Sequence, residues 1–361
     1  MTTHRLSRFR PRAPVSMLMA GVLAVGLILI GGSSTAGASH RGSMAVKKAA
    51  IPRAYRGTIG ALILVEADEQ GIRCLRAIQK EGAALGYKVT DIDAGYDPSK
   101  EIAGMNTFIN EKVNGIITFA TDDVLLAPEI KRAAAAHIPV IALTGGPVVP
   151  GLTWSLDMPE SVYSSAVETL LFKDILRSGR DRTAVEMVLP SAVPCRRREA
   201  AFEQTAKAFP QIKLIKYGIN GTNPVEDAYS YFSTYLLAHP NLGGVVSCWD
   251  IPVTGLITAA TADDISTSFT VTAINGSSDS VARMQNGQPY LKADVGIHLA
   301  MASYDATVQL VNLLQGKKTT IPTSRYSTMK WDMLTPGNLP PKGDVEFPSW
   351  LPTGWKPNYW K

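Results

Sequence analysis

Short apolar runs alternate with helical patterns along most of this 361-residue chain, beginning near residue 57. The expected strands of the first half are 58–65, 88–94, 115–120 and 139–144, with helical segments between them near 70–85, 99–113 and 123–137. Strands that are apolar on both faces and alternate with helices are typical of βαβ units, in which helices cover both faces of a parallel sheet. The first half is therefore predicted to form a doubly wound lobe.

The same alternation returns in the second half. The expected strands here are 183–189, 212–217, 244–248 and 269–274, with helical segments near 195–208, 224–238, 252–263 and 277–286. One more strand-like run, 291–295, precedes a last helical segment near 298–315. The chain is therefore predicted to be an α/β protein with two doubly wound parallel-sheet lobes joined by a hinge.

The lobe boundaries follow from where the chain is expected to cross over. Segment 145–157 is rich in Gly and Pro, which favour a connecting loop. We expect an N-terminal lobe of residues 57–152 plus 295–322 and a C-terminal lobe of residues 153–294 plus 323–335. Residues 336–361 combine many prolines with three tryptophans. They are predicted to form a C-terminal strap packed on the lobes.

The N-terminus has the pattern of a secretory signal peptide. Four arginines precede an apolar run from Val15 to Ile30, and small residues follow as far as Ala36-Gly37-Ala38. A retained membrane anchor is the alternative, but the apolar run is shorter than the roughly 20 residues that a span requires. We expect a signal peptide over residues 1–38, cleavage after Ala38, and a linker over residues 39–56.

The charge balance gives no indication of a basic surface for nucleic-acid binding. Taking the four leader arginines from the 36 basic residues leaves 32, against 31 acidic residues. The mature chain is thus nearly neutral, and the basic character of the whole sequence resides in its leader.

Three cysteines remain in the mature chain, at positions 74, 195 and 248. Their spacings match no zinc or redox motif. They are either three small buried residues or include a Cys195–Cys248 bridge, since both of these cysteines follow strand-like segments in the same half.

Polar residues gather where the predicted strands end, and parallel sheets bind ligands at that edge. These candidate ligand-binding residues are Asp68, Gln70, Asp122, Arg198, Trp249, Asn275 and Asp294. Carboxylates accept bonds from hydroxyls, Arg donates in a fixed fork, and an indole covers an apolar face. The alternatives are helix N-caps for the aspartates, a solvated helix start for the arginines and a core position for the tryptophan.

Short motifs recur in a fixed order over about residues 57–330. They are Glu81-Gly82, Leu85-Gly86-Tyr87, Asn114-Gly115-Ile116-Ile117, Thr121-Asp122, Ile138-Pro139-Val140-Ile141, Arg198 with Phe202, Ala238-His239-Pro240, Asn275-Gly276 and Asn286-Gly287. In this order they resemble the periplasmic sugar-binding proteins of the ribose-binding type. The family implies a type I periplasmic binding protein fold. It also implies capture of a small solute, a sugar or polyol, for the permease of an ABC importer.

The resemblance also implies roles for single residues. Asp122 matches the first-lobe carboxylate that accepts sugar hydroxyl bonds, and Arg198 matches the second-lobe arginine that clamps sugar oxygens. Asn275 stands where the family usually has Asp, and Asp294 where it often has Gln. Trp249 stands where an Asn is usual, and Asp68 and Gln70 fall in a loop where the family has Asn and aromatic residues. These departures leave the identity of the ligand open.

We also expect Arg196, two residues before Arg198, to face solvent and to contribute little to binding.

Three rival classes share parts of this pattern. A DNA-binding repressor would need a helix-turn-helix before the lobes, where this chain has a leader and linker. An enzyme would need a nucleophile elbow, a phosphate loop or a dinucleotide fingerprint, and none stands at a strand-to-helix turn. A receptor feeding a sensor kinase would look the same. We therefore expect a periplasmic, monomeric, non-enzymatic binding protein that uses no cofactor, metal or nucleic acid.

Overall fold

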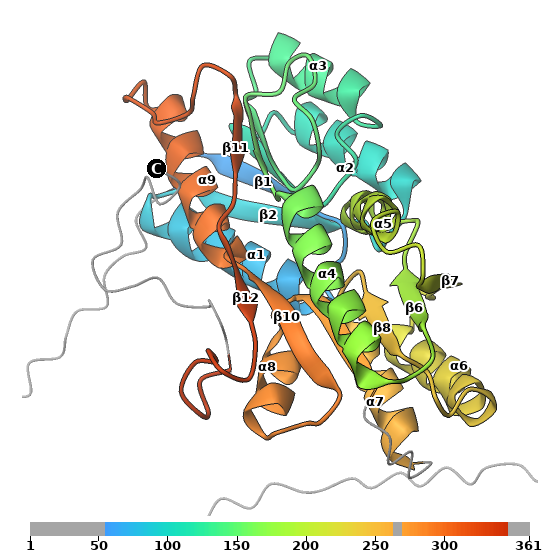
Figure 1. The fold of residues 1–361 in the computed structure, drawn as a ribbon. Helices are drawn as coiled ribbons and strands as arrows, with labels where there is room; N and C mark the ends of the chain where they lie inside the picture. Colours follow the sequence, from blue (N-terminus) through green and yellow to red (C-terminus); the bar gives the residue numbers. More distant parts are fainter. Residues whose placement is uncertain (1–54, 263–268, 346–361) are drawn as a thin grey trace, which may run out of the picture. The chain divides into compact units, whose positions relative to one another are not determined.

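The computed structural model describes residues 55–262 and 269–345, which form two α/β lobes (Figure 1). The first lobe contains β1 (Thr58–Ile63), α1 (Glu69–Ala84), β2 (Lys88–Asp93), α2 (Pro98–Asn110), β3 (Gly115–Phe119), α3 (Ala127–Ala135), β4 (Val140–Leu143), β5 (Trp154–Asp157), α9 (Leu299–Leu314) and β11 (Tyr326–Thr328). The second lobe contains α4 (Glu160–Ser178), β6 (Thr183–Val188), α5 (Val193–Ala206), β7 (Lys213–Gly218), α6 (Pro224–Ala238), β8 (Gly244–Ser247), α7 (Ile251–Ala262), β9 (Thr270–Asn275), α8 (Ser278–Gln285), β10 (Leu291–Ile297) and β12 (Trp331–Leu334).

Each lobe is built on one six-stranded sheet. The strand orders are β11-β5-β4-β3-β1-β2 and β12-β10-β9-β8-β6-β7. Every pairing is parallel except that of β12, which runs antiparallel to β10. The predicted pair of doubly wound parallel-sheet lobes is confirmed.

The burial of the strands explains this arrangement. The central strands β3, β4 and β8 are buried at every position, as expected for strands covered by helices on both faces. The edge strands β2 and β7 instead alternate between exposed and partly buried residues. In Figure 1, α1 and α9 lie together on one face of the first sheet, and they pack against each other.

The chain crosses between the sheets after β5, after β10 and after β11. The boundaries expected from sequence therefore need correction. β5 pairs with β4 and belongs to the first sheet, although we placed residues 153–294 in the C-terminal lobe. β10 continues in the second sheet to Ile297, and β11 pairs with β5 in the first. β5 was not predicted, because it is only four residues long and lies at the end of the Gly- and Pro-rich segment 145–157.

The described part of the expected strap, residues 336–345, contacts the end of α8. The side-chain Nε2 of Gln285 donates to the backbone oxygens of Pro340, Pro341 and Asp344. The side-chain Oε1 of Gln285 accepts from the backbone amide of Gly343. The rest of the strap, the signal peptide and residues 39–54 of the linker lie outside the described residues.

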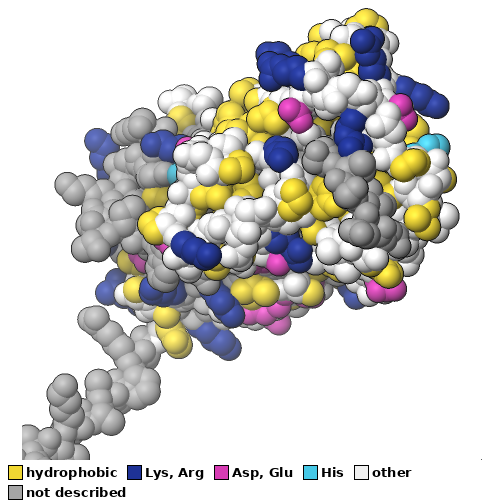
Figure 2. Space-filling view, turned by 60° about the horizontal axis from the view of Figure 1, so that its bottom comes forward, with side chains coloured by type: hydrophobic (Ala, Val, Ile, Leu, Met, Phe, Trp, Pro, Cys, Tyr) yellow, Lys and Arg dark blue, Asp and Glu magenta, His cyan; other side chains and the backbone are white. Residues whose placement is uncertain are grey.

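Two further observations concern the described helices and one face of the surface. Among residues 55–262 and 269–345, no helix has the length and apolar character needed to cross a bilayer. On the face in Figure 2, Lys and Arg side chains stand in small separate groups among hydrophobic and uncharged ones.

Candidate ligand-binding site

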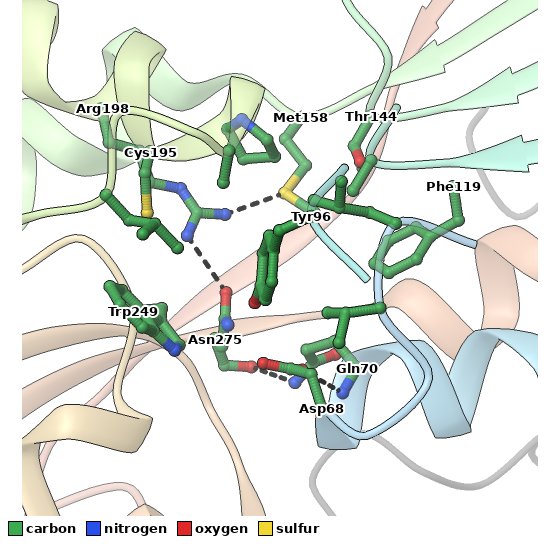
Figure 3. A pocket seen from close by; sticks show the side chains of 16 residues that line it. Asp68, Gln70, Tyr96, Phe119, Thr144, Met158, Cys195, Arg198, Trp249 and Asn275 are labelled. Carbon is green, nitrogen blue, oxygen red and sulfur yellow. Dashed lines mark hydrogen bonds between the residues drawn. The ribbon is translucent and has the colours of Figure 1, made fainter. Parts of the chain in front are cut away.

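A pocket lies between the lobes at the carboxyl ends of their strands (Figure 3). It encloses about 500 Å³ of empty space, including the part open to solvent. Its walls are mostly apolar, with a few polar groups from both lobes. The first lobe and the first crossing contribute Leu64, Val65, Asp68, Gln70, Tyr96, Phe119, Ala120, Thr144 and Met158, and the second lobe contributes Leu189, Ala192, Pro194, Cys195, Arg198, Trp249 and Asn275.

Arg198 is the cation of this pocket, and its side chain is only 2% exposed. Its Nη1 donates to the carbonyl oxygen of Cys248 at 2.5 Å and to Oδ1 of Asn275 at 3.2 Å. Its Nε donates to the hydroxyl of Tyr163 at 3.3 Å. Among the described residues, the only hydrogen-bond partner of its Nη2 is the thioether sulfur of Met158, at 3.3 Å, which is a weak acceptor. This Nη2 can therefore exchange its sulfur contact for a ligand oxygen.

The three consecutive arginines of α5 have three different surroundings. Arg198 enters the pocket, whereas Arg197 donates to both carboxylate oxygens of Asp157, at 2.8 and 2.5 Å, beside the first crossing. Arg196 reaches across the cleft and bonds Asp122. The expectation that Arg196 faces solvent is confirmed, since its side chain is exposed, but the first lobe also supplies it with a carboxylate partner.

Asn275 and Trp249 form the second-lobe side of the pocket. Asn275 ends β9 with a φ of 135°, a backbone conformation that costs about 1–3 kcal/mol in residues other than glycine. Its backbone oxygen accepts a bond from Nε2 of Gln70 in the other lobe, at 3.2 Å. Trp249 follows Cys248, and its side chain is buried. Both residues are where the sequence predicted a binding site.

Asp68 and Gln70 form the opposite side. Asp68 caps α1, accepting from the backbone amide of Gln70 at 2.7 Å, and it also lines the pocket. Asp68 thus caps α1 and lines the pocket at the same time. Burial, aided by the nearby charge of Asp250, raises the pKa of Asp68 to about 6.

Two buried polar atoms of pocket residues lack a hydrogen-bond partner within the described part of the chain. They are Oε1 of Gln70 and Oγ1 of Thr144. Buried polar groups are almost always paired in folded proteins, so each unpaired atom requires an explanation. A ligand that carries hydroxyl groups would supply the missing partners.

Two predicted site residues do not line the pocket. One oxygen of Asp122 accepts the backbone amides of Val124 and Leu125, each at 3.1 Å, and the other accepts Arg196 at 2.7 Å. Asp294 is fully buried and accepts from the amide of Gly276 at 3.2 Å and from the hydroxyl of Ser280. Asp294 therefore holds the turn after Asn275 in place, instead of facing the pocket.

Sequence reasoning missed Tyr96, Phe119 and Met158. Tyr96 belongs to the turn after β2, where it has a φ of 61° and its amide donates to the carbonyl of Leu64. Phe119 ends β3, and Met158 lies on the first crossing. The signal that could have found Tyr96 is Gly95-Tyr96 directly after a strand, at the edge where ligands bind.

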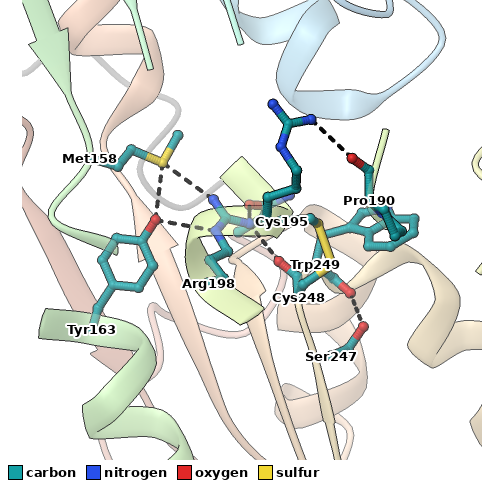
Figure 4. Close-up of a disulfide and its surroundings, with 10 residues drawn as sticks. Met158, Tyr163, Pro190, Cys195, Arg198, Ser247, Cys248 and Trp249 are labelled. Carbon is teal, nitrogen blue, oxygen red and sulfur yellow. Dashed lines mark hydrogen bonds between the residues drawn. A yellow bond between two sulfur atoms is a disulfide. The ribbon is translucent and has the colours of Figure 1, made fainter. Parts of the chain in front are cut away.

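Cys195 and Cys248 form a disulfide with a Cα–Cα distance of 5.3 Å, which confirms the pairing considered from sequence (Figure 4). Cys74 is free and buried, and burial raises the pKa of its thiol to about 12. The disulfide links the first turn of α5 to the segment after β8. Because Arg198 bonds the carbonyl of Cys248, the disulfide lies next to the pocket cation.

The described residues contain no group of three or more His, Cys, Asp or Glu side chains able to hold a metal ion. The polar groups of the pocket are amides, hydroxyls, one carboxylate and one guanidinium. This set suits hydrogen bonding to a small uncharged ligand better than metal coordination.

Comparisons with known proteins match this geometry. The family model described as "Periplasmic binding protein domain" matches residues 61–318. The ribose import binding protein RbsB of Bacillus subtilis (strain 168) is 23% identical over 243 residues, covering 67% of this chain and 77% of that protein.

Solved structures show the same fold. A solute binding protein of an ABC transporter from Agrobacterium vitis, with bound allitol, has a TM-score of 0.69 at 23% identity, covering 80% of this chain and 96% of that one. An ABC sugar transporter subunit from Rhodobacter sphaeroides has a TM-score of 0.69 at 19% identity, covering 79% and 99%.

Proposed function

This chain belongs to the periplasmic binding protein family, and from that premise we propose that it captures a sugar or polyol between its lobes for delivery to an ABC-type importer. It is a solute-binding protein of two lobes, and the pocket between them is its binding site. The observation that carries the proposal is the combination of Arg198 with unpaired oxygens on Gln70 and Thr144. These groups converge on one pocket from both lobes.

The chemistry of the pocket supports a hydroxylated ligand. Arg198 donates hydrogen bonds, Asp68 and Oε1 of Gln70 accept them, and Asn275 does both. Phe119 and Trp249 supply apolar surface that can cover the C–H face of a ring. Known relatives bind such molecules: one solved neighbour holds allitol and another holds D-arabinose.

Contacts across the cleft support closure of the lobes around the ligand. Besides the Gln70–Asn275 bond, Glu69 of α1 accepts from the backbone amide of Ser278, at 3.0 and 3.1 Å, and from its hydroxyl. Ser278 begins α8, so a carboxylate of one lobe caps a helix of the other. A ligand held from both sides would add to these bonds and stabilise the closed state.

The remaining features fit the same function. The family consists of non-enzymatic binding proteins of the periplasm. Export by cleavage of residues 1–38 would place this chain there, as a monomer that docks on its permease. A receptor that feeds a sensor kinase is the alternative, and the names of the similar structures, which describe ABC transporters, favour an importer.

A thermal-shift screen of the mature protein against sugars, polyols and sugar acids tests this function. A ligand present at 1,000 times its Kd adds about 4 kcal/mol of stability, which gives a clear rise in the melting temperature. We expect at least one sugar or polyol to give this rise. A rise produced only by amino acids or other compounds without hydroxyl groups would overturn the assignment.

A further inference from the structure

A second cavity adjoins the ligand pocket on the side of α6. We call the pocket around Arg198 the inner pocket and this second cavity the outer compartment. The two share four lining residues, Val65, Asp68, Tyr96 and Trp249. Including the parts open to solvent, the outer compartment encloses about 1130 Å³ and the inner pocket about 500 Å³. The larger part of the cleft thus lies outside the inner pocket.

The outer wall has the mixed character that a sugar ring requires. Gly95 contributes from the first lobe, while the turn 221–223 and the start of α6 contribute from the second. Val225 presents an apolar side chain that is 38% exposed, next to the exposed polar side chains of Thr222 and Glu226. Sugar rings combine an apolar C–H face with hydroxyl edges, so adjacent apolar and polar side chains match both parts.

Two aromatic residues stand where the cavities meet. Tyr96 comes from the turn after β2 of the first lobe, and Trp249 comes from the segment after β8 of the second. Figure 3 shows the ring of Tyr96 projecting into the pocket among side chains of both lobes. The positive φ of Tyr96 costs conformational energy, which is typical of residues that hold a ligand. Both rings line the inner pocket and the outer compartment, so each can contact two parts of one ligand.

Taking the proposed sugar-binding function as given, we infer that the natural ligand is a glycoside with at least two rings, such as a disaccharide. Its first ring would bind Arg198 and Gln70 in the inner pocket. Its second ring would lie in the outer compartment against Val225. The linkage between the rings would pass between Tyr96 and Trp249. A single small ring would leave the outer compartment filled with water.

Matched pairs of sugars test this inference by titration calorimetry. The probes are D-glucose with maltose and cellobiose, D-galactose with melibiose, D-xylose with xylobiose, and L-arabinose with arabinobiose. At least one disaccharide is expected to bind ten times more tightly than its own monosaccharide. Equal or weaker binding by every disaccharide, beside clear binding of a monosaccharide, would overturn the inference and leave the proposed function standing. If no sugar or polyol binds, either here or in the thermal-shift screen, the proposed function itself fails.

Variants of α6 locate the second ring. Val225→Trp places an indole where the second ring would lie and should lower disaccharide affinity at least tenfold, with monosaccharide affinity changed less than twofold. Ser230→Trp is the control, because Ser230 is exposed on the same helix and lines neither cavity. If Val225→Trp does not fold, Thr222→Trp in the preceding turn replaces it. Unchanged disaccharide affinity in a folded outer-compartment variant would contradict the inference.

Discussion

Arg196 of α5 donates a hydrogen bond from Nη2 to Oδ2 of Asp122 over 2.7 Å, and this ion pair joins the second lobe to the first. Asp122 was predicted from sequence as a sugar ligand and Arg196 as a residue that faces solvent. Arg196 is exposed as expected, and the two side chains bond each other across the cleft. The pair lies beside the pocket and outside its lining.

Removing this ion pair should weaken binding only slightly. The side chains of Arg196 and Asp122 are 43% and 27% exposed, and ion pairs in such positions contribute less than about 1 kcal/mol. We expect Arg196→Ala and Asp122→Ala each to lower ligand affinity less than about fivefold. A double-mutant cycle measured by calorimetry checks the coupling between them. A coupling above 2 kcal/mol, on the order of thirtyfold in affinity, would instead place the pair in a desolvated site.

The disulfide should stabilise the second lobe and hold the pocket in shape. Cys195 and Cys248 are 53 residues apart, and closing a loop of that size contributes about 2–4 kcal/mol to the free energy of unfolding. We expect Cys195→Ala/Cys248→Ala to lose about this much in urea unfolding. Ligand affinity should also fall, because Arg198 bonds the carbonyl of Cys248.

Reducing agent provides the control for the disulfide. Wild-type protein should lose stability when reduced, whereas the double variant should not respond. Equal loss in both proteins would assign the effect to another site.

Two buried acids in the second lobe should make stability decline as the pH rises from about 4.5 toward 9. Glu168 of α4 and Glu186 of β6 are fully buried. Burial, and then the charge of Glu186, raises the pKa of Glu168 to about 9, and burial raises the pKa of Glu186 to about 8. An acid whose pKa is raised by folding stabilises the protein at low pH, and that stability is lost as the pH rises toward the folded pKa.

Glu168→Gln removes one of these titrations while it keeps the shape of the side chain. The variant should therefore gain stability over wild type between pH 7 and pH 9 and should differ little near pH 4.5. Urea unfolding at a series of pH values measures this. Parallel pH profiles for the two proteins would show that Glu168 does not titrate in this range.

Export should remove the first 38 residues. A short apolar run followed by Ala36-Gly37-Ala38 predicts a mature N-terminus at Ser39. N-terminal sequencing of protein recovered from the exported fraction checks this. Full-length protein found in the membrane fraction would favour a retained anchor.

The fold was predictable because its signal repeats along the chain. Runs such as 115–120 are mostly apolar and recur between helical patterns, which leaves few alternatives to a covered parallel sheet. β5 was missed, since four residues after a Gly- and Pro-rich segment carry too little pattern to distinguish a strand from a loop.

The site was only partly predictable, because sequence gives a residue's position along a strand but not its partners. Arg198, Asn275, Trp249, Asp68 and Gln70 line the pocket as expected. Asp122 follows β3, whereas Asp294 lies within β10, and both carboxylates accept hydrogen bonds from other groups of the protein. Tyr96 was missed, since its entry into the pocket depends on a turn with positive φ.

Binding by Arg198→Ala tests the central claim most directly. The guanidinium is buried, and within the described part of the chain its Nη2 bonds only a thioether. A ligand oxygen there would gain a charge-assisted bond worth about 1.5–3 kcal/mol. Calorimetry of wild type and Arg198→Ala, with a sugar or polyol found by screening, should show at least a tenfold loss of affinity. Arg177→Ala, on the distant end of α4, should bind as wild type does. Unchanged affinity in a folded Arg198→Ala protein would contradict the assignment of this pocket as the sugar site.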